Sequence, residues 1–254
     1  MLIKNDQGWL NWHRLWGLMI TPLFQRLGCE VTVEVDLAFQ KQILDVVVVR
    51  KRKHKKLPKL INPDYYEGFE TLNEYNLISF KSFNEVFNHQ ALEEFYGHLT
   101  NYRKLNQIEK DGLINLYAVT HHLPDKLFKP YLNTPFLSVI KPDMIYELKL
   151  LTPVRFIITR KMNHPILGLF SNDLQQIMKS RERLEHDQWL INEVNSYLGE
   201  LYKFYQLEGL NMPYTQEMFI KDHYPEWYKK IEIATITGEK IGIKKGEVRG
   251  IKKG

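Results

Sequence analysis

The hydrophobic residues near the amino terminus recur at the period of a helix, and those that follow recur at the period of strands. The helical set spans residues 8–27 and ends before Gly28. It comprises Trp9, Trp12, Trp16, Met19, Leu23 and Leu27. Residues 31–37 alternate between apolar and polar, which predicts a half-buried strand. Residues 42–49 are almost continuously apolar, which predicts a strand covered on both faces and paired with the first as an antiparallel hairpin.

The rest of the chain continues as strands and helices. We expect further strands over 76–83, 114–120, 136–140, 144–151 and 154–159, and helices over 89–104, 124–132, 172–207 and 215–230. The order helix, three strands, helix, strand is typical of an α/β fold in which helices flank a mixed sheet. We therefore predict an α/β domain over 1–165, a helical C-terminal region over 166–232 and a tail over 233–254.

The tail has a four-residue glycine period. Glycine occupies positions 238, 242, 246, 250 and 254, and the segment Gly-Ile-Lys-Lys-Gly occurs twice. Each glycine opposes helix formation by about 1 kcal/mol. The pattern predicts a flexible basic segment, which is either a low-complexity linker or a segment that becomes ordered on a partner.

Composition limits the class of protein. The chain of 254 residues, with 44% hydrophobic content, is long enough for a sizeable core. Its lone cysteine, Cys29, excludes an internal disulfide and fits a reducing compartment. The apolar stretch over 15–24 is too short to cross a bilayer and lacks a signal-peptide cleavage pattern. We therefore expect a soluble, cytoplasmic protein without a membrane partner.

Positive charge is concentrated rather than spread. The net charge is +5, yet the run over 50–59 alone holds seven lysines and arginines and no acidic residue. Its basic residues are Arg50, Lys51, Arg52, Lys53, Lys55, Lys56 and Lys59. Such a cluster can hold the phosphates of a nucleic acid. The alternative is a solvated hairpin loop that protects a sheet edge against aggregation.

Two charged residues interrupt strands that are otherwise apolar. Asp45 lies near the start of the strand over 42–49, and Lys81 lies in the strand over 76–83. A buried charge without a partner costs several kcal/mol of solvation. We therefore interpret Asp45 and Lys81 as a functional pair that converges at one end of the sheet.

This arrangement resembles the PD-(D/E)XK nuclease superfamily, and in particular its recombination-promoting nucleases of the YhgA/YdaD-like, transposase-associated group. The resemblance covers about residues 8–160, and it rests on residues 44–47, on residues 77–82 and on the helix that follows with its Tyr102. The glycine-periodic tail is also similar to that group. The resemblance implies a restriction-endonuclease-like mixed sheet and Mg²⁺-dependent hydrolysis of DNA.

The resemblance also implies roles for individual residues. Asp45 matches the first metal-binding carboxylate, the backbone carbonyl of Phe80 matches a metal ligand, and Lys81 matches the catalytic lysine. The basic run over 50–56 and Tyr102 are expected to contact DNA. Cutting two strands would favour a homodimer.

The match fails at position 79. The family pattern has Glu or Asp there, two residues before the lysine, whereas this chain has Ser79. Loss of a carboxylate about 4 Å from the ion removes on the order of 4 kcal/mol per unit of ion charge at an effective dielectric constant of about 20. The substitution therefore predicts impaired metal binding and impaired catalysis.

Another carboxylate could replace the missing acid, since in some members of the superfamily the acid lies on the following helix. Glu94, His98 and Tyr102 are four residues apart and form one stripe, which could aim Glu94 at the sheet as a metal ligand and catalytic acid. The alternative is that this stripe lines a solvated edge. Glu34 and Asp36, on one face of the first strand, are a second possible source.

Three functions remain open from the sequence. The first is a metal-dependent DNA endonuclease. The second is a catalytically inactive nucleic-acid-binding or regulatory module with the same fold. The third is a protein-interaction scaffold formed by the helical C-terminal region and the tail. The adjacent His121 and His122 follow a strand, and we expect them to point to opposite faces and so not to chelate one ion.

Overall fold

The computed structural model describes residues 12–36, 43–51, 63–207 and 229. The chain divides into two compact units, Met1–Tyr197 and Leu198–Gly254. The sheet and the helices that cover it belong to the first unit. In the described ranges no helix is both long and apolar enough to cross a membrane.

The first unit contains a seven-stranded mixed sheet in the order β1-β2-β3-β4-β7-β6-β5. The strands are β1 (Cys29–Asp36), β2 (Ile43–Lys51), β3 (Tyr75–Lys81), β4 (Ile114–Thr120), β5 (Leu137–Lys141), β6 (Ile145–Leu148) and β7 (Val154–Ile158). Strands β1, β2 and β3 form an antiparallel meander. Strands β3, β4 and β7 are parallel, and β6 and β5 continue the sheet in antiparallel pairing.

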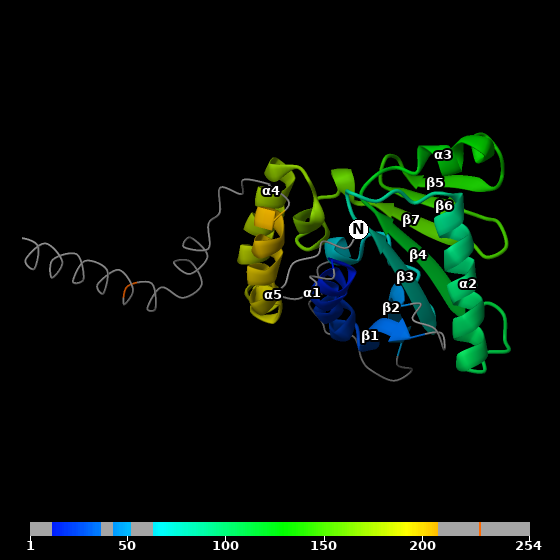
Figure 1. Ribbon diagram of the computed structural model, residues 1–254, viewed down its shortest axis with the longest axis horizontal. Coiled ribbons are helices and arrows are strands. Elements are labelled where there is room, and N and C mark those ends of the chain that lie inside the picture. Colours follow the sequence, from blue (N-terminus) through cyan, green and yellow to red (C-terminus); the bar gives the residue numbers. More distant parts are fainter. Residues whose placement is uncertain (1–11, 37–42, 52–62, 208–228, 230–254) are drawn as a thin grey trace, which may run out of the picture. The chain divides into compact units, whose positions relative to one another are not determined.

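Helices lie on both sides of this sheet (Figure 1). Helix α1 (Trp12–Arg26) covers one face, and α2 (His89–Leu105) covers the other. The other described helices are α3 (Asp125–Phe128), α4 (Leu174–His186) and α5 (Gln188–Leu207). Short 3₁₀ turns occur at η1 (Pro63–Tyr66), η2 (Lys129–Tyr131), η3 (Thr159–Lys161) and η4 (Leu167–Phe170). The α/β class, the mixed sheet flanked by helices and the helical C-terminal region were predicted and are confirmed. The tail lies outside the described residues.

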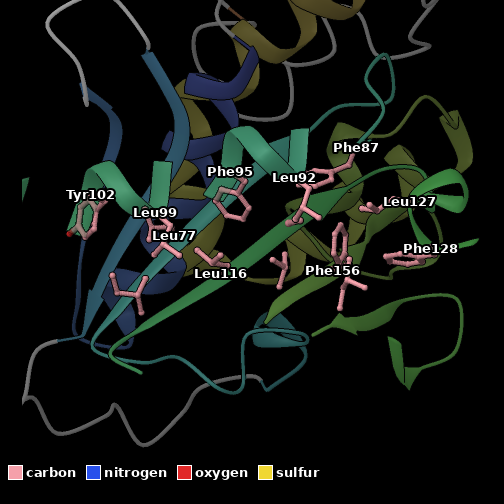
Figure 2. Packing of buried hydrophobic residues seen from close by; sticks show 14 of the residues in the cluster. Leu77, Phe87, Leu92, Phe95, Leu99, Tyr102, Leu116, Leu127, Phe128 and Phe156 are labelled. Carbon is pink, nitrogen blue, oxygen red and sulfur yellow. The ribbon is translucent and has the colours of Figure 1, made fainter. Parts of the chain in front are cut away.

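Successive side chains of strand β3 point to opposite faces of the sheet, and each face is covered by a different helix. On one face, the ring of Phe80 stacks on Trp16 of α1 with centroids 4.7 Å apart and planes 7° from parallel. On the other face, Leu77 packs into the core cluster beneath α2, next to Leu99 (Figure 2). The strand is therefore a central, buried element, as its apolar composition indicates.

The core cluster under α2 is dominated by aromatic rings. Phe156 of β7 contacts Phe87 and Phe128 edge to face, with centroid distances of 5.2 and 5.0 Å (Figure 2). Leu92, Phe95 and other buried residues of α2 close the cluster from above. Because these residues recur every three or four positions, α2 presents one apolar face to the sheet.

The segment after β7 is held by a buried histidine. His164 donates from Nε2 to the carbonyl of Tyr65 at 3.0 Å, and its Nδ1 accepts from the backbone N–H groups of Ile166 and Leu167 at 3.0 Å each. Burial lowers the pKa of His164 to about 4, so the ring is neutral near pH 7. A neutral imidazole can both donate and accept, and this explains how one ring ties η1 to the start of η4.

The helical pattern predicted over 172–207 is two helices, and the boundary between them is Asp187. Its backbone N–H donates to the carbonyl of Leu184, which ends α4. Its carboxylate accepts from the backbone N–H of Leu190 at 3.0 Å, which caps the start of α5. The first compact unit extends past residue 165 to Tyr197, and Gln176 of α4 donates to the carbonyl of Thr159 at 2.7 Å.

Replacing Phe156 by alanine should lower the free energy of unfolding by about 3–5 kcal/mol, because it removes a buried ring and leaves a cavity. Phe136→Ala is the matched control, since its ring is 49% exposed. Guanidinium titration followed by tryptophan fluorescence measures both. Equal losses in the two variants would contradict the assignment of Phe156 to the core.

Candidate functional site

The carboxyl ends of β3, β4 and β7 meet at one edge of the sheet because these strands are parallel. Lys81 ends β3, His121 follows β4, and Thr159 follows β7. The backbone N–H of His121 donates to the carbonyl of Lys81 at 3.2 Å, which ties the first two ends together. Open α/β sheets bind ligands at such an edge, where the loops after successive strands converge.

The loop after β3 brings Glu85 back to Lys81. Oε2 of Glu85 accepts from the backbone N–H and from the hydroxyl of Ser82, at 3.1 and 3.0 Å. The same oxygen lies 3.2 Å from Nε2 of His13, on α1. Oε1 lies 3.6 Å from Nζ of Lys81, beyond ordinary hydrogen-bond length. One carboxylate oxygen is therefore anchored, and the other faces the lysine.

Glu85 is held in its ionised form. Burial by itself would raise its pKa, but the hydrogen bond and charge of His13, the Lys81 ammonium and the Ser82 N–H outweigh burial and lower it to about 2. Its side chain is 26% exposed, and those of His13 and Lys81 are 14% and 19% exposed. The pair of charges at the end of β3 is thus partly screened from water, yet accessible from it.

Two histidines line the neighbouring strand end. His121 is buried, its Nδ1 lies 3.5 Å from the hydroxyl of Thr159, and its Nε2 has no hydrogen-bond partner within the described part of the chain. Burial and the adjacent His122 lower the pKa of His121 to about 4, so this ring is neutral near pH 7. Nε2 of His122 donates to the carbonyl of Phe83 at 2.8 Å, which fixes its tautomer.

A metal centre built from side chains is not found in the described ranges. No group of three His, Cys, Asp or Glu residues there could hold a metal ion. The rings of His121 and His122 are nearly perpendicular, at 83°, with centroids 4.8 Å apart. Asp45 is not included in this finding, because its side chain lies outside the described residues.

The backbone of Asp45 falls in β2, directly before Val46, which is paired with Ser79 of β3. Ser79 itself is buried, with 7% exposure. Phe80 is also buried, with its side chain against α1. The register therefore sets the backbone of Asp45 beside the strand that ends at Lys81.

Of several other residues predicted for DNA or metal binding, the structure describes at most the backbone. Arg50 and Lys51 are the last residues of β2, and Glu34 and Asp36 belong to β1, but the side chains of all four lie outside the described residues. So does the segment that contains Arg52, Lys53, Lys55 and Lys56.

Glu94 and Tyr102 make contacts with residues other than Lys81. Glu94 is exposed on α2 and accepts a hydrogen bond from Gln90, one turn earlier, at 3.1 Å. Tyr102 is buried in the core cluster, and its ring contacts Tyr75 at a centroid distance of 6.1 Å. Glu94 thus occupies the solvent side of α2, and Tyr102 contributes to packing.

Sequence reasoning missed Glu85 and His13. The sequence signal available for Glu85 was the pattern Ser82-x-x-Glu85, in which a carboxylate often returns to the backbone N–H three residues earlier. No local signal connects His13 with Glu85, because α1 and the loop after β3 are far apart in sequence.

No family model matches this chain, and neither a curated protein nor a solved structure matches it. Function is therefore inferred from the side chains at this edge of the sheet.

Glu85 should contribute to stability in a defined pH range. Because its pKa is about 2 in the folded state and 4.5 ordinarily, its contribution is present above pH 4.5 and is lost as the pH falls towards 2. Thermal unfolding between pH 7 and pH 2.5 should therefore show a smaller loss of stability for Glu85→Gln than for the wild type. Glu94→Gln, which removes an exposed carboxylate, should follow the wild-type curve.

Proposed function

We propose that this protein is a metal-dependent DNA endonuclease that hydrolyses phosphodiester bonds at the carboxyl end of β3. The observation that carries the proposal is the position of Lys81. Its ammonium ends the central buried strand, lies 3.6 Å from an ionised carboxylate and keeps 19% of its side chain exposed. A phosphate group can approach such a cation from solvent, while the strand behind it holds the residue in place.

The ligands proposed for this site are oxygen atoms, which is the ligand type that a hard cation prefers. Mg²⁺ prefers oxygen ligands, and we propose as its ligands the carboxylate of Asp45 and the backbone carbonyl of Phe80, the two groups that the resemblance implies. When bound, such an ion supplies charge stabilisation at phosphate and a more acidic water. Asp45 would hold the ion from β2, next to the strand that carries Phe80 and Lys81.

Lys81 has the role of stabilising the charge that develops on the phosphate. A cation fixed before the reaction needs no rearrangement when that charge appears. The Glu85 carboxylate lies 3.6 Å from the Lys81 ammonium, and the Lys81 carbonyl accepts from the His121 N–H. The backbone and the side chain of Lys81 are thus both restrained.

DNA is the substrate that the charge distribution favours. Seven basic residues lie over 50–59, and phosphate contacts of this type weaken steeply as salt is raised. The first of them, Arg50, pairs with Tyr75 at the opposite end of β3 from Lys81, so a duplex that contacts both would follow the length of the strand. A homodimer would supply two sites for the two strands. A cytoplasmic location belongs to the same proposal, since the single cysteine fits a reducing compartment.

A second candidate is a nucleic-acid-binding module of the same fold without catalysis. The neutral Ser79 stands where the resemblance places an acid, and the Glu85 carboxylate already lies 3.6 Å from the Lys81 ammonium. Both features favour a site that binds a phosphate without a metal ion.

Plasmid nicking separates these functions. In Mg²⁺ or Mn²⁺, the wild-type protein should nick supercoiled DNA, and the activity should disappear in EDTA. Asp45→Ala and Lys81→Ala should each reduce it at least 100-fold, because each removes a charge at the scissile phosphate. Lys126→Ala, at an exposed lysine of α3, is the matched control and should retain activity.

The same samples report on binding. One outcome is that the wild type and Asp45→Ala bind a fluorescent duplex with similar affinity in EDTA and yet nick DNA in neither Mg²⁺ nor Mn²⁺. That result would reject the endonuclease in favour of the inactive binding module. Absence of both binding and nicking would reject both.

A further inference from the structure

We infer that Glu85 supplies the second carboxylate of the catalytic site, in place of the acid that is absent at position 79, and that His13 of α1 positions it. The inference rests on the proposed function and deepens it. It assigns to Glu85 an oxygen that binds the divalent cation beside the phosphodiester.

The two oxygens of Glu85 are used differently, and this difference supports the assignment. Oε2 receives the Ser82 N–H, the Ser82 hydroxyl and Nε2 of His13, at 3.1, 3.0 and 3.2 Å. Oε1 receives no hydrogen bond within the described residues and faces Lys81 at 3.6 Å. The carboxylate is therefore oriented through one oxygen, and the other is available to a ligand.

The anchor is stronger than a turn alone requires. A Ser-x-x-Glu turn is complete when the carboxylate accepts from the serine backbone N–H. Here a third element, α1, contributes His13, whose ring also meets Phe80 of β3 edge to face with centroids 6.0 Å apart. A fixed orientation of this kind is what a metal ligand requires.

The position of Glu85 also fits. Ser79 and Lys81 are two residues apart on one strand, so the acid expected at position 79 would share a face with the lysine. The loop after β3 returns Glu85 to within 3.6 Å of that lysine. Glu94 has no comparable placement, because it is exposed and accepts from Gln90 on its own helix.

The decisive comparison uses Glu85→Gln, which removes the charge and keeps the shape, against Glu94→Gln. Mn²⁺ affinity, measured by calorimetry on the protein without DNA, should fall at least 10-fold in Glu85→Gln and less than twofold in Glu94→Gln. Nicking should fall at least 100-fold in the first variant alone. Equal Mn²⁺ affinity in Glu85→Gln and the wild type overturns the inference.

A double variant tests the replacement itself. It combines Ser79→Glu with Glu85→Gln. The new carboxylate should restore at least a tenth of the wild-type nicking rate and most of the wild-type Mn²⁺ affinity. A structural role of Glu85 predicts no restoration, because position 79 cannot replace its contacts with Ser82 and His13.

Two further variants keep the inference testable if Glu85→Gln does not fold. Glu85→Asp keeps the charge but withdraws the carboxylate from Lys81, so Mn²⁺ affinity should fall. His13→Gln keeps the Glu85 carboxylate but removes one of the groups that orient it, and should weaken Mn²⁺ binding 3- to 10-fold. Unchanged Mn²⁺ affinity in both variants overturns the inference.

Failure of the proposed function is distinguishable from failure of this assignment. Nicking that requires Asp45 and Lys81 but survives Glu85→Gln leaves the endonuclease standing and removes Glu85 from it. Absence of nicking in the wild type rejects the endonuclease, and an undiminished Mn²⁺ affinity in Glu85→Gln then rejects the assignment independently.

Discussion

Burial of strand β3 on both faces is the constraint on which the site depends. Residues 76–80 of the strand are buried, with Phe80 stacked against Trp16 of α1 and Leu77 packed beneath α2. An unpaired charge within such a strand would cost several kcal/mol of solvation. The charge that the strand carries therefore lies at its last residue, Lys81, where water and a carboxylate can both reach it.

The path of the chain after β3 explains why other polar groups gather at the same place. Helix α2 connects β3 to β4 as a crossover, so the two strands run parallel and their carboxyl ends share one edge of the sheet. The addition of β7 in parallel brings Thr159 next to His121. The same crossover buries the apolar face of α2, so the packing that stabilises the fold also assembles the site.

The balance of charge at this edge decides what the site can do. One carboxylate, Glu85, lies between His13 and Lys81, and its two oxygens have different tasks. If the oxygen that faces Lys81 also binds a cation, the lysine and the acid act together on a phosphodiester. If it remains paired with the lysine alone, the edge is an anion site with a fixed cation. These two uses of the edge thus differ in what binds to a single oxygen of Glu85.

The amino-acid sequence by itself determined the kind of fold, and it marked Lys81 as a charge at the end of an apolar strand. The period of the hydrophobic residues distinguishes α1 and α2 from the strands, and the polar interruption of β3 marks its end. The break at Asp187 was missed because both sides of it have helical periodicity. The partner of Lys81 was decided by tertiary structure alone: the stripe containing Glu94 indicated a helix face but not its distance from the strand end. Glu85 reaches Lys81 through a loop, and His13 reaches Glu85 from another element. Such contacts depend on how α1 packs against β3, which no local pattern of residues encodes.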